Sequence, residues 1–260
     1  EARKDPQLMK LISRVNQIYN QRPESIEKVQ ARCSNLSHVA VLLSEAVAET
    51  VAAGPDKVYV DCTFGRGGHS RLILSQLSER GQLKAFDVDP SAVRVGKELE
   101  VSDSRFEIFH RPFSDLPLVM SGPVGGILLD LGVSSPQLDD VNRGFSAKAK
   151  KDGPLDLRMN QESGISAADW LKTTKAAQLA WVIDVCGHSL DLLHCERIAE
   201  VILGHQEQHG SYESTRQLAE VLRELAPQFE DEHPSLSLPI VVFTAIRVFL
   251  NREMDQLDEA

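Results

Sequence analysis

The stretch that decides the fold is Val58-Tyr59-Val60-Asp61-Cys62-Thr63-Phe64-Gly65-Arg66-Gly67-Gly68-His69-Ser70. Its apolar start predicts a buried strand that ends in a carboxylate. Three glycines within four residues then predict a loop whose backbone a ligand can approach closely. A helix is predicted to begin next, and its positive N-terminal end points toward the same loop. This order is typical of a nucleotide-type cofactor site in an open α/β sheet.

A second carboxylate stands at a meaningful distance from this loop. Asp87 lies 19 residues after Gly68, at the end of the next predicted strand. A strand-tip carboxylate about 20 residues beyond a glycine loop can accept hydrogen bonds from the ribose hydroxyls of an adenosine. The alternative is a tight turn closed by a capping Asp. Asp89 and Pro90 fit the N-cap and the first position of the following helix.

The alternation of strands and helices predicts a doubly wound parallel sheet. The predicted strands are 57–62, 82–87, 105–109 and 126–131, and the predicted helices between them are 69–79, 90–99 and a short one near 114–120. Right-handed crossovers place the first strand centrally, the second and third on one side, and the fourth on the other. The fourth strand is left with a bare edge, so we expect missing closing strands or a partner that covers it.

The alternation stops after Gly132, and the predicted domains follow from this change. Residues 133–165 read as a long functional loop region, and the helices predicted beyond it are 166–173, 176–185, 192–203, 214–225 and 240 to the end. We therefore predict an N-terminal helical extension (1–37), a Rossmann-like domain (38–137 and 233–260) and an inserted all-helical domain (138–232). Residues 238–242 have strand character.

Composition limits the classes of function. The chain is 42% hydrophobic and 25% charged with a net charge of −10, which argues against a broad basic surface for nucleic acid. Residues 1–38 hold seven Lys/Arg and four Asp/Glu, a net of +3, so the remainder carries −13. This basic arm either contacts phosphate or is a solvated helix. We expect no membrane span and no signal peptide.

Metal binding is not expected either. The four cysteines lack metal-ligand spacing, which favours reduced thiols. His205 and His209 lie four apart on a predicted helix that Gly210 ends, and a solvated face is the favoured interpretation.

Several longer stretches carry a family likeness. They are Gly126-Ile127-Leu128-Leu129-Asp130-Leu131-Gly132-Val133-Ser134-Ser135-Pro136-Gln137-Leu138-Asp139-Asp140 and Asp152-Gly153-Pro154-Leu155-Asp156-Leu157-Arg158-Met159, together with 38–43, 61–74, 112–115 and 143–146. The chain resembles the MraW/RsmH family of S-adenosylmethionine-dependent methyltransferases. The resemblance implies methylation of the exocyclic N4 of a cytosine in small-subunit ribosomal RNA.

The resemblance also implies the residues of a cofactor site. The residues expected to bind S-adenosyl-L-methionine are Gly65, Gly67, Gly68, His69, Asp87, Phe113, Asp130 and Gln137. Asp87 would hold the ribose hydroxyls and Phe113 would pack near the adenine, although Phe113 without the family reads as a core aromatic. Asp130 and Ser134 are the expected catalytic residues, because acceptors at the tip of strand four can orient the cytosine amino group. No metal is expected.

Departures from the family pattern keep an alternative open. Residues 186–189 depart from a Tyr-Gly-Glu-Glu-type turn of the family, and residues 204–207 and 233–239 lack the basic and Arg-bearing elements that the family has there. The alternative is an inactive, methyltransferase-like assembly factor of the ribosomal small subunit, which binds rRNA and partner proteins. A third candidate is a dinucleotide-dependent oxidoreductase, because such enzymes also combine a glycine loop with an Asp at the end of the next strand. We expect a mitochondrial matrix protein, with the cytoplasm as the alternative.

Two local expectations concern the loop region after the fourth strand. Asp156 and Arg158 are expected to form a pair that orders this loop. Lys148, Lys150 and Lys151 either touch phosphate or lie in a solvated loop.

Overall fold

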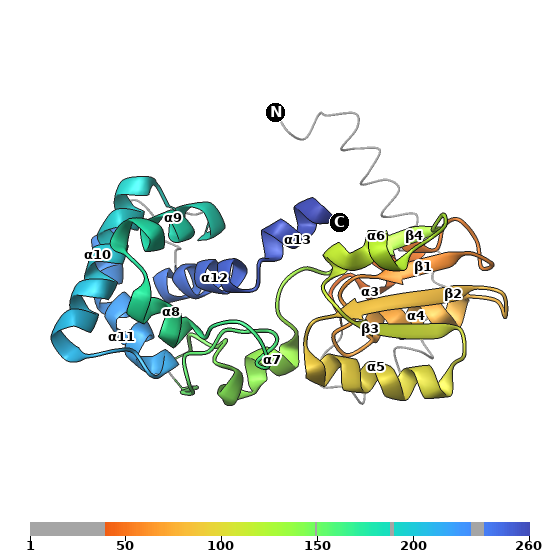
Figure 1. The fold of residues 1–260 in the computed structure, drawn as a ribbon, viewed down its shortest axis with the longest axis horizontal. Coiled ribbons are helices and arrows are strands. Elements are labelled where there is room, and N and C mark those ends of the chain that lie inside the picture. Colours follow the sequence, from red (N-terminus) through yellow and green to blue (C-terminus); the bar gives the residue numbers. More distant parts are fainter. Residues whose placement is uncertain (1–39, 149, 188–189, 230–236) are drawn as a thin grey trace. The chain divides into compact units, whose positions relative to one another are not determined.

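The structure is a computed structural model that describes residues 40–148, 150–187, 190–229 and 237–260. The described residues form two compact units, one ending at Leu131 and one spanning Gly132–Glu259 (Figure 1). The predicted extension 1–37 lies outside the described residues. Within the described ranges, no helix is both long enough and apolar enough to cross a membrane.

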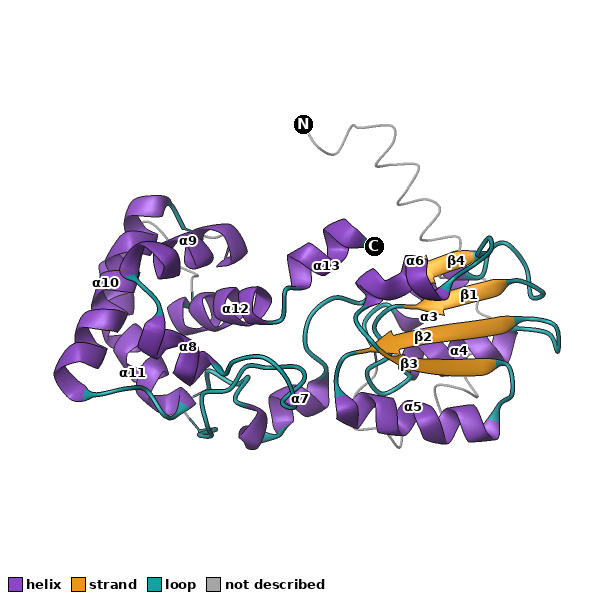
Figure 2. Cartoon of the chain, viewed as in Figure 1, coloured by secondary structure: helices purple, strands orange, loops and turns teal. Residues whose placement is uncertain are grey.

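The first unit is built on a parallel four-stranded sheet, drawn in orange in Figure 2. Its strands are β1 (Val58–Asp61), β2 (Gln82–Asp87), β3 (Phe106–His110) and β4 (Gly126–Leu128). Their order is β3-β2-β1-β4, which confirms the predicted topology. Asp61 pairs with both Ala85 and Leu128, so the carboxyl ends of the strands meet at one edge.

Helix α3 (Leu43–Thr50) precedes β1, and helical segments follow β1, β2 and β3 as the alternation predicts. They are α4 (Gly68–Gln76), α5 (Pro90–Ser102), the 3-10 turn η2 (Phe113–Asp115) and α6 (Leu116–Val119). Asp89 caps α5 by accepting a 2.8 Å hydrogen bond from the Ser91 N–H, and Pro90 occupies the first helical position. Both predictions for this helix start are confirmed.

Successive residues of β1 point to opposite faces of the sheet, and each face has its own apolar cluster. Tyr59 belongs to the larger cluster, which α3, α4 and α5 complete. Val60 belongs to a smaller cluster with Phe86 and Phe113, the latter contributed by η2. The central strand is buried on both faces, as a parallel sheet requires.

β4 is shorter than predicted, and this matters for the candidate site. Its ladder ends at Leu128 rather than at Leu131, so Asp130 lies just beyond the sheet. Within the described part of the chain β4 pairs with β1 alone. Ile127 and Leu129 are 41% and 40% exposed beside this edge. The expected bare edge is thus present in the described structure.

The second unit is helical. Its elements are α7 (Ser135–Asp139), η3 (Val141–Arg143), α8 (Ala167–Thr173), α9 (Ala176–Gly187), α10 (Leu192–His209), α11 (Thr215–Leu225), η4 (Ala226–Phe229), α12 (Leu238–Leu250) and α13 (Glu253–Glu259). Ser166 and Ser214 cap α8 and α11 as predicted, accepting from the backbone N–H groups of Asp169 and Gln217. Helices α8, α9, α10, α11 and α12 all contribute buried residues to one apolar core.

The last long helix begins two residues before its predicted start at residue 240, and it belongs to the second unit. Residues 238–242, which have strand character in sequence, form the start of α12. Leu238, Val242 and Ile246 recur at helical spacing and are buried in the core of the second unit. α12 packs against α9 and α11 in the second unit, whereas the sequence pattern predicts that 233–260 belong to the sheet domain.

Candidate cofactor site

The carboxyl end of β1 carries a fully buried carboxylate, Asp61. Its Oδ1 accepts a 3.1 Å hydrogen bond from the Thr63 N–H, and its Oδ2 accepts a 2.6 Å bond from the Ser70 hydroxyl. Burial raises the pKa of Asp61, and these two bonds oppose that rise. Asp61 therefore ties the tip of β1 to the first turn of α4.

The glycine loop follows in a conformation that requires glycine. Gly65 and Gly67 have φ values of 56° and 77°, in the left-handed region. A Cβ on Gly67 would lie 2.8 Å from Cζ of Phe64. Because Phe64 is buried and its ring contacts that of Phe106, the ring cannot easily yield. At Gly67 the packing of the loop itself therefore leaves no room for a side chain.

Asp87 joins the tip of β2 to this loop. Its Oδ2 accepts a 2.8 Å hydrogen bond from the Gly65 N–H, and its Oδ1 accepts a 2.8 Å bond from the Asp89 N–H. Each carboxylate oxygen has a second lone pair for a further donor. Burial raises the pKa of Asp87 to about 6, although the two backbone bonds lower it. The predicted proximity of Asp87 to the glycine loop is confirmed.

His69 and Asp130 approach one another at the tips of β1 and β4. His69 Nε2 lies 3.2 Å from the carbonyl oxygen of Val41, and since a carbonyl only accepts, this nitrogen carries a proton. Nδ1 lies 3.9 Å from Oδ2 of Asp130, whose side chain is 48% exposed. The backbone N–H of Asp130 donates a 2.8 Å bond to the Thr63 hydroxyl. Polar atoms of both residues thus lie close together near the carboxyl ends of β1 and β4.

Phe113 is placed in the apolar cluster with Val60 and Phe86 and is 8% exposed. Phe113 is therefore a core aromatic residue of the first unit. Its packing near an adenine remains a prediction.

Ser134 and Gln137 belong to the second unit. Ser134 is the N-cap of α7, and Gln137 Oε1 accepts a 2.8 Å bond from the Ser134 N–H. Gln137 is 5% exposed. This reciprocal cap explains both residues locally. Their catalytic and cofactor roles remain predictions.

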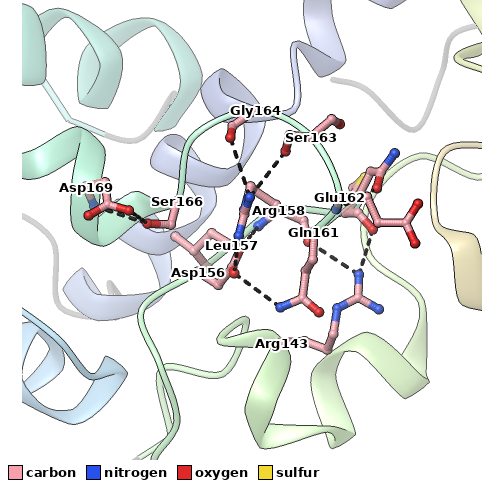
Figure 3. A network of polar contacts seen from close by, with 12 residues as sticks. Arg143, Asp156, Leu157, Arg158, Gln161, Glu162, Ser163, Gly164, Ser166 and Asp169 are labelled. Atoms are coloured by element: carbon pink, nitrogen blue, oxygen red, sulfur yellow. Dashed lines mark hydrogen bonds and ion pairs between the residues drawn. The ribbon is translucent and has the colours of Figure 1, made fainter.

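The loop that precedes α8 is ordered by a network of polar contacts (Figure 3). Arg158 donates from Nε and from one terminal nitrogen to the two carboxylate oxygens of Asp156, each at 2.8 Å. Its other terminal nitrogen donates to the carbonyls of Ser163 and Gly164. Gln161 adds a 3.2 Å bond to Asp156. The predicted Asp156–Arg158 pair is confirmed.

The remaining residues singled out in the sequence are the possible metal ligands and the possible phosphate-binding lysines. Among the described residues no cluster could hold a metal ion, and the His205 and His209 rings stack with centroids 4.3 Å apart. Lys151 donates to Asp139 and to the Leu138 carbonyl, so it is engaged locally. Phosphate contacts by the neighbouring lysines remain a prediction.

Two residues of the site were missed by sequence reasoning. Val41 fixes the His69 ring through a backbone carbonyl, which every residue has, so no pattern could single it out. Thr63 acts through a side-chain hydroxyl two residues after the strand-tip carboxylate Asp61. Its position within the loop was the one available signal.

Comparison with known proteins gives one strong match. The model of the MraW methylase family matches residues 35–260. An rRNA methylase from Streptococcus thermophilus is 22% identical with a TM-score of 0.26, over 31% of this chain and 46% of that one. A Clostridium thermocellum protein assigned as an rRNA methylase is 16% identical with a TM-score of 0.29, over 34% and 51%. The matched parts span about half of those two chains.

Proposed function

The chain belongs to the MraW methylase family, and on that premise we propose that it is an S-adenosylmethionine-dependent methyltransferase. We propose as its acceptor the exocyclic N4 of a cytosine in small-subunit ribosomal RNA. The observation that carries the proposal is the 2.8 Å bond from the Gly65 N–H to Asp87. It joins the glycine loop and the strand-tip carboxylate into one rigid element.

The residues of this element fit an adenosyl cofactor. The open lone pairs of Asp87 can accept the two ribose hydroxyls. The first turn of α4 has backbone N–H groups without partners inside the helix, and these can donate hydrogen bonds to the carboxylate of the cofactor's methionine part. Asp87 and Asp130 place two carboxyl groups at this edge of the sheet, which suits a cationic ligand. The bound cofactor supplies an electrophilic methyl group on a sulfonium.

The chain's own residues would act by alignment. Transfer from a sulfonium is an in-line displacement, so holding the acceptor at the correct angle dominates the rate. A cytosine amino group is a weak nucleophile because its lone pair is delocalised into the ring. The half-exposed carboxylate of Asp130 can accept a hydrogen bond from one N–H of the cytosine amino group and so hold that group in place. The base must leave its stack to reach such a site.

One observation favours the second candidate, a methyltransferase-like assembly factor of the small subunit. Ile127 and Leu129 are exposed beside an edge of β4 that pairs with no other described strand. An apolar edge strand of this kind fits pairing with a partner protein. The acidic net charge also suits a protein partner better than a large RNA surface.

Titration calorimetry of the full chain with S-adenosylmethionine tests the cofactor proposal. We expect saturable binding that Asp87→Ala abolishes and that Asp56→Ala leaves unchanged, because Asp56 lies before β1 and pairs with Arg80. Titration with NAD is the parallel arm and should give no binding. Absence of S-adenosylmethionine binding, or equal loss in both variants, would contradict the proposal.

Mapping of modified cytosines in the small-subunit rRNA after depletion separates the two candidates. Loss of one modified cytosine is expected for the enzyme. Loss of assembled subunits with every cytosine modification intact would instead support the assembly factor. Re-expression of Asp130→Ala should fail to restore the modification while restoring the protein itself.

A further inference from the structure

The ladder between β1 and β4 ends at Cys62, and the turn of the glycine loop begins at Gly65. Its last backbone bond is donated by the Cys62 N–H to the Leu128 carbonyl, at 2.9 Å. Beyond it the two chains are joined by a side chain: the Asp130 N–H donates to Oγ1 of Thr63 at 2.8 Å. The Thr63 hydroxyl therefore takes the place of the next carbonyl in the ladder.

Thr63 is itself held firmly. Its N–H donates to Asp61, which is 0% exposed and also accepts from the Ser70 hydroxyl in the first turn of α4. A fully buried carboxylate that receives two hydrogen bonds fixes the groups that donate them, because leaving it unpaired would be costly. The Thr63 hydroxyl is thus anchored through Asp61 to the strand and the helix that carry the glycine loop.

Asp130 needs such an anchor because it lies outside the sheet. β4 ends two residues earlier, and the Asp130 side chain is 48% exposed. In the first unit its carboxylate is 3.9 Å from Nδ1 of His69. The position of its backbone against the loop is set by the bond to Thr63.

We propose that Thr63 is a positioning residue that fixes Asp130 against the glycine loop. The proposal rests on the proposed function, in which Asp130 orients the methyl acceptor. A misplacement of about 1 Å can cost about 10²-fold in rate when alignment dominates a reaction. The Thr63 hydroxyl therefore sets how well Asp130 performs, although Thr63 itself need not touch cofactor or acceptor.

Three variants of the full chain test this role. Thr63→Val keeps the shape of the side chain and removes the acceptor, and Thr63→Ser keeps the hydroxyl. Thr50→Val is the matched control, since the Thr50 hydroxyl donates to the Ala46 carbonyl within α3, away from Asp130. Thr63→Ala replaces Thr63→Val if that variant does not fold.

The first readout is amide hydrogen exchange at Asp130, measured by NMR without any ligand. We expect exchange about tenfold faster in Thr63→Val, which is the change for the loss of one hydrogen bond. Thr63→Ser should stay near the wild-type rate, and Thr50→Val should match it. An unchanged rate in Thr63→Val, or equal acceleration in Thr63→Ser, would overturn the proposal.

The second readout is turnover at saturating S-adenosylmethionine in a double-mutant cycle with Asp130→Asn. If Thr63 acts through Asp130, Thr63→Val lowers kcat about tenfold or more in the wild-type chain and less than about twofold in Asp130→Asn. Additive losses would overturn the proposal. A wild-type chain with a slowly exchanging Asp130 amide but no cofactor binding would instead refute the proposed function, so the two failures are distinguishable.

Discussion

The side-chain amide of Asn251 donates a 2.8 Å hydrogen bond to the carbonyl oxygen of Leu157, a buried residue with a φ of +62°. Its Oδ1 also accepts a 2.7 Å bond from the Met159 N–H. The amide thus pairs with the loop as a neighbouring strand would. A left-handed leucine costs of order 1–3 kcal/mol, so contacts around it must hold it in place. Asn251, at the end of α12, supplies two of them.

Asn251→Ala is expected to lower the free energy of unfolding of the second unit by about 2 kcal/mol, about one for each lost bond to the loop. Urea denaturation followed by far-UV circular dichroism measures the change. Gln208→Ala, an exposed substitution on α10, serves as the control and should shift the free energy by less than about 0.5 kcal/mol. Equal stability of the two variants would show that the loop does not depend on Asn251.

Asp156→Asn is expected to destabilise the same loop and to remove part of its acid sensitivity. Burial raises the pKa of Asp156, but hydrogen bonds from Arg158 and Gln161 outweigh burial, so the pKa lies below its ordinary value. A lowered pKa in the folded chain contributes stability that is present above the unfolded pKa of about 3.9 and is lost as pH falls through the folded value.

We expect a loss of about 2 kcal/mol at pH 7 for Asp156→Asn, because it leaves the Arg158 guanidinium partly buried without its partner. Denaturation at a series of pH values should show that the difference in unfolding free energy between Asp156→Asn and the wild type becomes smaller below a pH of about 4. Asp255→Asn removes an exposed pair with Arg252 and should cost less than about 0.5 kcal/mol. A gap that stays constant with pH would contradict the assignment.

The sheet could be predicted because its signals are local. Apolar runs, glycines and caps such as Asp89 act within a few residues, and the handedness of crossovers then orders the strands. The same logic placed Asp87 beside Gly65. Residues 238–242 are ambiguous in sequence because the β-branched Ile240, Val241 and Val242 favour a strand locally, whereas packing against α9 and α11 stabilises the helix predicted from residue 240.

Contacts between residues far apart in the chain have no local signal in the sequence. Asn251 lies 94 residues from Leu157, and Asp130 lies 67 residues from Thr63. A side-chain amide or hydroxyl carries no periodic signal that says which distant backbone group it will meet. The left-handed Leu157 was equally hidden, since only glycine and a few polar residues indicate positive φ in sequence.

Gly67→Ala is expected to damage the glycine loop directly. Its φ of +77° disfavours any side chain, and the new Cβ would lie 2.8 Å from the buried ring of Phe64. We expect a loss of about 1–3 kcal/mol in unfolding free energy together with loss of S-adenosylmethionine binding. Gly122→Ala, where the Cβ meets open space, should leave both quantities near wild type. Normal calorimetric binding by Gly67→Ala would place the cofactor elsewhere.

Binding of S-adenosylmethionine should depend on the ionisation of Asp87. Burial raises its pKa to about 6, with the nearby charges of Asp61 and Asp89 adding to the rise. Ribose hydroxyls donate more strongly to a carboxylate than to a neutral acid. Affinity should therefore be full above pH of about 6 and fall by at most about tenfold per pH unit below it.

Calorimetric titrations across this range measure the step, and Asp87→Asn is the matched control. An amide cannot ionise, so this variant should bind more weakly and lack the step near pH 6. Asp61 also has a raised pKa, but it remains in Asp87→Asn, so any step that it causes would persist in the variant. A step of equal size in both proteins would assign the titration to Asp61. A flat wild-type profile would show that ribose recognition does not require the ionised Asp87.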